Sequence, residues 1–421
     1  MTKTSRDHFP RSTFPRLLGY PGFAAFWLAD SLSNVGIFVF TLSLQLLLID
    51  VMSAGPLEIG WVRSAQWLPS LLFGLAAGVV IDRLPRKRLL ITADLISCAL
   101  LLLIAALAMT GHLNPILLAA LVFGLGTAAV FQGGAHQSFL ADMLPTELLT
   151  AGNVKLSQTY TAAQTLGPLL GGLLVRTVGA PLALLANALS YGASALLLMR
   201  VPQPTRHVPP QTRSLAVELR EGISWVYGHR LLAPYAWCLH LWFIGNAIAG
   251  TIFVFHATSL GLNPAQIGLT LACAGLAGIA GAALAEPISR RIGWGIAILS
   301  ADFITGAAWI LAAFSQMDFA LPILCAAQFI YGFGLGMRGP LEMTLRNTLT
   351  PSALRGRMNT TIRSINWGLI AVAAPLGGWV ATRIGTGPTL SLAGAIMIGT
   401  GLALLASPFR GASISDANSA G

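Results

Sequence analysis

The chain has 421 residues, of which 55% are hydrophobic and only 10% are charged, and its formal net charge is +10. Soluble domains carry roughly 25% charged residues, so this composition excludes a large soluble enzyme, a disordered protein and a fibrous protein. The basic residues lie in short gaps between long apolar runs. That pattern is typical of membrane topology and not of a nucleic-acid-binding surface.

Twelve apolar runs are long enough to cross a bilayer as helices. A helix satisfies its own backbone hydrogen bonds in lipid, whereas a membrane β-barrel would show short alternating segments. The first run, from Gly22, is too long for a signal peptide, so we expect no cleavage. The predicted spans are residues 22–49, 57–81, 88–110, 115–140, 150–175, 181–200, 231–257, 265–288, 294–315, 319–343, 356–382 and 387–407.

The longest polar interruption, residues 201–230, divides these spans into two sets of six. Its first part is rich in proline, which indicates an extended linker. Its second part repeats apolar residues at helical spacing, which predicts an amphipathic helix along the cytoplasmic interface. Because Lys and Arg favour the cytoplasmic side, both termini are predicted to lie there. The expected parts are a tail at 1–21, a bundle at 22–200, the linker at 201–230, a bundle at 231–407 and a tail at 408–421.

Short sequences recur between the two halves at a nearly constant spacing. Thr-Ala-Asp-Leu-Ile at 92–96 returns as Ser-Ala-Asp-Phe-Ile at 300–304, and Asn153 has a counterpart in Asn359. Four such matches in the same order favour a duplicated bundle. Transporters use such repeats to build a midplane site between two bundles.

The sequence Gly-Val-Val-Ile-Asp-Arg-Leu-Pro-Arg-Lys-Arg occupies residues 78–88. Its glycine, its Asp-Arg pair and its basic cluster resemble the loop signature of the major facilitator superfamily. We expect the glycine to let a neighbouring helix approach closely and the charged residues to form a polar clasp. The alternative is that the basic cluster only anchors the topology. The copy at 281–291 lacks Asp-Arg. The residues of the expected clasp are Gly78, Asp82, Arg83, Arg86 and Asp142.

A second motif, Gly-Pro-Leu-Leu-Gly-Gly at 167–172, resembles a signature of exporters in that superfamily. Small residues allow tight packing and a proline bends a helix, so packing without bearing on transport direction is the alternative. A further exporter signature, with Arg before Gln-Gly, is incomplete because position 129 is Ala. In the superfamily the arginine of this signature is tied to proton coupling, so the resemblance does not extend to that residue. The candidate packing residues are Gly167, Pro168, Gly171 and Gly172.

Other segments resemble the bacterial branch that includes macrolide-efflux and enterobactin-efflux proteins. They are Ser-Asn-Val-Gly at 33–36, Ala-Asp-Leu at 93–95, Glu-Leu-Arg-Glu-Gly-Ile at 218–223 and Leu-Arg-Gly-Arg-Met-Asn at 354–359. The resemblance covers essentially the whole chain. It implies an all-α membrane protein with twelve transmembrane helices in two six-helix bundles, the major facilitator fold.

Charged residues inside spans are costly and therefore mark candidate sites. Asp30, with Asn34 one turn further on the same face, is the first candidate for binding a proton or a cationic substrate. The alternative is a structural pair between Asp30 and an arginine near the cytoplasmic end. Arg63 is expected either to pair with Glu58 or to serve an outer gate.

Two polar pairs occupy repeat-related positions and indicate cavity lining or an inner gate. The alternative for the second pair is that its members only bind each other. Asp94 and Asp302 also repeat, and we expect them to have a structural role near helix starts. The two pairs are Gln132 with His136, and Arg338 with Glu342.

The sequence therefore predicts a monomeric secondary transporter of the bacterial inner membrane. It is expected to export a small amphipathic molecule, a drug or a siderophore-like metabolite, with protons as the coupling ion. An importer of the same fold is the alternative, and a membrane-embedded enzyme is a more distant one. The chain has no HExxH, GxSxG or P-loop motif, so we expect no catalysis, no metal site, no cofactor and no nucleic-acid partner.

Overall fold

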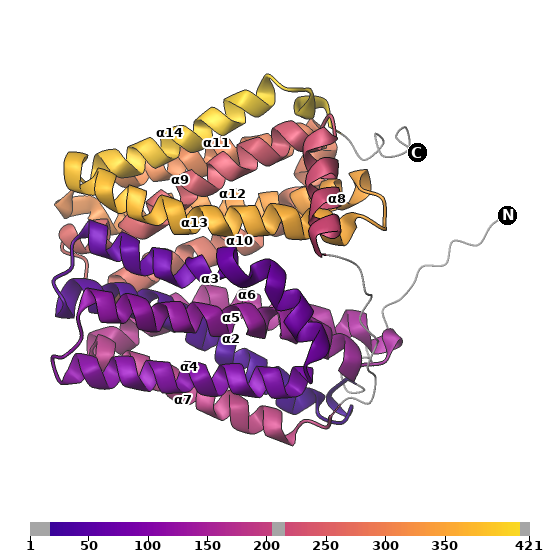
Figure 1. Ribbon diagram of the computed structural model, residues 1–421. Coiled ribbons are helices and arrows are strands. Elements are labelled where there is room, and N and C mark those ends of the chain that lie inside the picture. The colour runs from indigo at the N-terminus through magenta and orange to yellow at the C-terminus, as the bar shows by residue number, and fades with distance from the viewer. Residues whose placement is uncertain (1–16, 204–214, 413–421) are drawn as a thin grey trace.

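The computed structural model describes residues 17–203 and 215–412, apart from the side chains at 75, 76, 78–80, 82, 83, 215, 216, 218 and 219. Figure 1 shows two helical bundles side by side, with their long helices roughly parallel. The helix α8 lies at one end of the molecule, which we call the linker side. The opposite end is the far side.

The amino-terminal bundle contains six long helices. Helix α2 continues into a π-helical turn, η1, before the loop that leads to α3. The helices are α2 (Phe23–Leu46) with η1 (Leu47–Val51), α3 (Pro56–Arg83), α4 (Arg86–Met109), α5 (Pro115–Met143), α6 (Thr146–Val178) and α7 (Ala180–Arg200).

The carboxy-terminal bundle repeats this arrangement after α8 (Leu215–Gly228). Its six long helices are α9 (Leu232–Ser259), α10 (Pro264–Ile292), α11 (Trp294–Ala313), α12 (Ala320–Leu349), α13 (Arg355–Ile384) and α14 (Thr386–Leu405), with short 3-10 turns at Met317–Phe319 and Pro408–Gly411. All twelve predicted spans are therefore confirmed as helices, and most of their ends agree within a few residues.

Local chemistry explains where several helices begin and end. Asn114 and Asn263 each accept a hydrogen bond from the first turn of the helix that follows, and a proline comes directly after each asparagine. Gly179, Gly293 and Gly385 have positive φ values of 85°, 90° and 88°. Because glycine adopts such values without steric cost, each one ends a helix and lets the next begin at once.

Ten helices in the described part of the chain are long and apolar enough to cross a membrane. Helices α3 and α6 complete the twelve, since they have similar lengths and pack alongside the others. Helix α6 is among the more polar of the long helices. On α6, Gln158 and Gln164 are exposed. Helices α3 and α6 make the main contacts with the other bundle, α3 with α13 and α6 with α10.

Helix α8 runs across the linker-side end of the carboxy-terminal bundle (Figure 1). It contacts α13 and α9. Gly222 is buried against Thr361 and the backbone of Arg357, and Glu221 forms an ion pair with Arg357. Val226 is completely buried, whereas Ile223 is 40% exposed. The amphipathic helix therefore docks on one bundle and presents part of its apolar surface outward.

Candidate functional site

A polar cluster occupies the interior of the amino-terminal bundle near α2 and α5. His136 Nε2 lies 2.8 Å from Asp30 Oδ1, although its geometry does not make a good hydrogen bond. Asn34 donates to the other carboxylate oxygen at 2.9 Å. Phe26 stacks on the His136 ring with centroids 5.0 Å apart. The structure thus pairs Asp30 with a histidine and not with an arginine.

Asp94 on α4 adds a second carboxylate to this cluster. It is fully buried, Gln132 donates to Oδ1 at 2.5 Å, and Ser194 donates to Oδ2 at 2.6 Å. Asp94 also interacts electrostatically with His136 and Asp30. The hydrogen bonds that it accepts come from neutral groups. The amino-terminal bundle therefore holds two carboxylates and one histidine in a connected group.

The carboxy-terminal bundle contains the counterpart of this group. Asp302 on α11 is fully buried, and Arg338 donates to it at 2.7 Å while Thr400 donates at 3.0 Å. Arg338 Nε also lies 3.3 Å from Glu342, and Glu342 accepts from Arg346 at 2.7 Å. Arg338 and Glu342 do interact, but Asp302 is the closer partner of Arg338.

The central role of the two buried aspartates was missed from the sequence. Asp94 and Asp302 were expected to act near helix starts, yet each binds side chains from two other helices of its bundle. The two aspartates are 208 residues apart in the sequence. The spacing of 206 residues between Ser194 and Thr400 was the further signal that could have revealed the network.

The two bundles meet where α3 packs against α13 and α6 packs against α10, a contact surface that we call the seam. At the far side the seam is closed by packing of backbone against backbone. A Cβ atom at Gly60 would lie 2.6 Å from the carbonyl oxygen of Ala374, and one at Gly378 would lie 2.3 Å from that of Pro56. Ser64 donates to the carbonyl of Ala371 at 2.5 Å. Arg63 donates to a carbonyl of α9 at 2.8 Å, so it contacts the other bundle and does not pair with Glu58.

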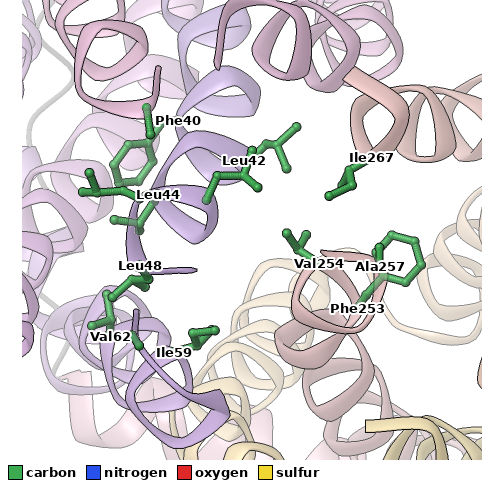
Figure 2. Close-up of a cluster of buried hydrophobic side chains, with 14 of the residues drawn as sticks. Phe40, Leu42, Leu44, Leu48, Ile59, Val62, Phe253, Val254, Ala257 and Ile267 are labelled. Carbon is green, nitrogen blue, oxygen red and sulfur yellow. The ribbon is translucent and has the colours of Figure 1, made fainter. Parts of the chain in front are cut away.

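Apolar side chains line the same region (Figure 2). Leu42 lies between the two groups of labelled side chains, one from each bundle. The first group is Leu44, Leu48, Ile59 and Val62, and the second is Phe253, Val254, Ala257 and Ile267. All of these side chains are buried.

The glycines of 167–172 serve two different contacts. A Cβ at Gly167 would lie 2.5 Å from Phe38, and one at Gly171 would lie 3.1 Å from Val39, both on α2. Gly172 faces the other bundle, where a Cβ would lie 2.3 Å from the carbonyl of Pro264. The neighbouring Pro168 is buried inside α6. This motif therefore packs α6 within its bundle and also across the seam.

The expected clasp is present in part. Arg86 Nη1 lies 2.5 Å from Asp142 Oδ2, as the sequence predicted. Both residues belong to the amino-terminal bundle, on α4 and α5, so this ion pair alone does not join the bundles. The side chains of Gly78, Asp82 and Arg83 lie outside the described residues. In the described part of the chain, no group of three or more His, Cys, Asp or Glu side chains could hold a metal ion.

The family model of the Major Facilitator Superfamily matches residues 26–367. The chain belongs to this superfamily. The multidrug efflux pump Tap of Mycolicibacterium fortuitum is 25% identical over 331 residues, which cover 76% of this chain and 79% of that protein. The enterobactin exporter EntS of Citrobacter koseri is 24% identical over 405 residues, covering 92% of this chain and 91% of that protein.

Solved structures share the fold. The crystal structure of nucleoside transporter NupG superimposes with a TM-score of 0.69 at 14% identity, covering 91% of this chain and 98% of that one. The protein is therefore a multi-pass membrane transporter with the twelve-helix architecture of the superfamily.

Proposed function

We propose that the protein exports a small amphipathic molecule, a drug or a siderophore-like metabolite, in exchange for protons, as a monomer in the bacterial inner membrane. Two similar proteins, named as a multidrug efflux pump and an enterobactin exporter, support the direction of transport. The fold supports transport but does not select a direction, since a nucleoside transporter shares it.

The observation that carries proton coupling is the group of Asp30, His136 and Asp94. An ionised carboxylate is costly to bury unless a cation neutralises it. Histidine as a residue type exchanges protons in the physiological pH range, whereas arginine does not, and Asp30 lies beside His136 while Asp302 pairs with Arg338. Proton binding and substrate binding would then compete for this group and couple the two movements.

Alternating access supplies the rest of the cycle. The close packing of α3 with α13 and of α6 with α10 at the far side supports a state that is closed at that side. We assign the linker side to the cytoplasm. Cysteines introduced in place of His112 and Arg220, both exposed, should then react with an impermeant reagent from opposite faces of the membrane. Labelling of position 220 from outside would reverse the assignment.

The coupling group is tested by Asp30→Asn and Asp94→Asn in proteoliposomes with an imposed pH gradient. Each substitution keeps the shape and removes the charge. We expect accumulation against a substrate gradient to fall by at least about 10-fold, the effect of losing one interaction of about 1.4 kcal/mol or more. Downhill flux should persist.

A matched control is Glu286→Gln, which removes an exposed carboxylate that pairs only with Arg290 in the next turn of its helix. It should transport like the unmodified protein. Undiminished uphill transport by both aspartate variants would exclude the group as the coupling site and direct attention to Glu342. Accumulation in the opposite direction would favour the importer.

A further inference from the structure

A small pocket lies beside the far-side seam, between α2 and α3. It encloses about 70 Å³. Its wall is apolar on one side, where Leu44, Leu48, Ile59 and Val62 lie together (Figure 2). The other lining residues are polar or aromatic: Thr41, Gln45, Arg63, Gln66 and Trp67.

Arg63 is the cation of this pocket, and none of the carboxylates that the structure describes pairs with it. Among the described residues it has no ion-pair partner within 4 Å, and its Nε is buried without a hydrogen bond. Arg338 and Arg346 show the usual solution, since both bind Glu342 and Arg338 also binds Asp302. Buried arginines are normally paired, so the Arg63 guanidinium, which has no carboxylate partner among the described residues, differs from Arg338 and Arg346.

The surroundings of Arg63 are built to hold the guanidinium in place without neutralising it. Arg63 Nη1 donates to the carbonyl of Gly250, and a Cβ at Gly250 would lie 3.1 Å from Nη2. One turn earlier on α9, Asn246 accepts a hydrogen bond from Tyr331 at 2.7 Å. A side chain at position 250 would crowd the guanidinium and move it slightly away from α9.

Gln45 provides a second unsatisfied group. It is 9% exposed, and its Oε1 has no hydrogen-bond partner. A side-chain amide can turn to present either its oxygen or its NH₂ group, so Gln45 can donate to a ligand beside Arg63. An arginine and an amide that converge on one pocket match the two oxygens of a carboxylate or catecholate.

We propose that Arg63 and Gln45 bind the acidic group of the transported molecule, so that the substrate is an amphipathic organic anion. This inference rests on the proposed export function and narrows the proposed substrates to molecules that carry a negative charge. The pocket is far smaller than the roughly 300–1,000 Å³ of a drug-sized site, so only the acidic group enters it. Trp67 lines the pocket and meets Trp367 of the other bundle with ring centroids 5.8 Å apart. This aromatic pair contacts the apolar body.

The test measures binding and not transport, with three probes of equal size and different charge. They are 1-naphthoate, 1-naphthamide and 1-naphthylmethylammonium, applied by equilibrium dialysis to the full-length protein in lipid nanodiscs, with empty nanodiscs subtracted. We expect naphthoate to bind about 10-fold more tightly than naphthamide, and the ammonium probe to bind more weakly still. In Arg63→Gln the preference for the anion should disappear, and in Arg63→Lys it should persist in reduced form.

The matched control is Arg383→Gln, which removes a cation that lies over Trp379 at the far end of α13, away from the pocket. It should keep the full preference for naphthoate. If Arg63 served only to latch the far-side seam, Arg63→Gln would weaken all three probes equally, which would overturn the proposal. Failure of the unmodified protein to bind naphthoate, or equal binding of the three probes, would also overturn it. The two proposals can fail separately. If the preference for the anion depends on Arg63 but transport is not driven by protons, the anion site is supported and only the proton coupling is refuted.

Discussion

The amino-terminal and carboxy-terminal bundles each bury an aspartate at the same place and stabilise it by different means. Asp94 accepts from Gln132 and Ser194, whereas Asp302 accepts from Arg338 and Thr400. A hydroxyl on the last helix of the bundle is common to both networks. The decisive difference is an uncharged amide in one bundle and a permanent cation in the other.

The two networks therefore differ in charge. In the carboxy-terminal bundle a guanidinium, which stays protonated at every physiological pH, pairs with Asp302. In the amino-terminal bundle the donors to Asp94 are an amide and a hydroxyl. Under the proposed exchange mechanism, proton binding belongs to the amino-terminal bundle, and the ion pair of the carboxy-terminal bundle stays fixed.

The largest expected effect is on stability, and it comes from a substitution that gives Asp302 an uncharged amide partner like that of Asp94. Arg338→Gln would leave Asp302 buried with only neutral donors and would remove one partner of Glu342. Breaking a buried ion pair by removing one partner costs about 3–5 kcal/mol. We expect a matching loss in the free energy of unfolding, measured by chemical denaturation in detergent. Arg290→Gln, at an exposed pair, is the control and should have little effect. Equal stability of Arg338→Gln and the unmodified protein would show that the cation is dispensable.

The reverse exchange, Gln132→Arg, makes the first bundle like the second. A permanent cation beside Asp94 would pair with that carboxylate as Arg338 pairs with Asp302, and it would occupy the place that the proposal gives to a proton. We expect uphill transport in proteoliposomes to fall by at least about 10-fold while downhill flux and folding remain. Gln132→Met, which adds bulk without charge, separates crowding from electrostatics. Full uphill transport by Gln132→Arg would mean that the proton is carried elsewhere.

The smallest expected effect lies outside both interiors, where the linker enters the second bundle. His229 Nδ1 accepts from the backbone N–H groups of Leu231 and Leu232 at 3.1 and 3.2 Å, and burial lowers the pKa of His229. The unfolded chain therefore takes up this proton first as the pH falls through about 6.5. The contribution of His229 to stability is present above that pH and is lost below it.

His229→Gln should accordingly reduce the drop in melting temperature between pH 7.5 and pH 5.5, with His112→Gln as an exposed control. Because His229 is only partly buried, the change should be modest. An unaltered pH dependence would assign all of the acid sensitivity to other groups, including those of the amino-terminal interior.

The twelve helices were predictable because apolar length alone marks a span in lipid, and because Asn-Pro and Gly mark the boundaries between helices. The partners of polar residues were less predictable. Asp30 and Asn34 were found from their spacing within one helix. The partners of Asp94 come from two other helices, and periodicity within one helix cannot reveal which neighbours face one another.

Arg63 illustrates the same limit at the seam. Its two expected roles were a pair with Glu58, which is close in sequence, and an outer gate. Its observed contact is a carbonyl 187 residues away. The packing of one bundle against the other decides such contacts. Every residue has a backbone carbonyl, so the sequence does not identify this acceptor, and the only sequence feature at the contact is Gly250, which makes room for the arginine.

The docking of α8 has a consequence for synthesis of the protein. Its ion pair joins Glu221 to Arg357, which is 136 residues later in the chain. At roughly 5–20 residues per second, a ribosome needs about 7 to 27 s to produce that partner. Helix α9, which α8 also contacts, is made directly after α8, whereas α13 is made much later. We therefore expect the nascent α8 to have only part of its docking surface throughout this interval and to reach its final position once α13 is in place.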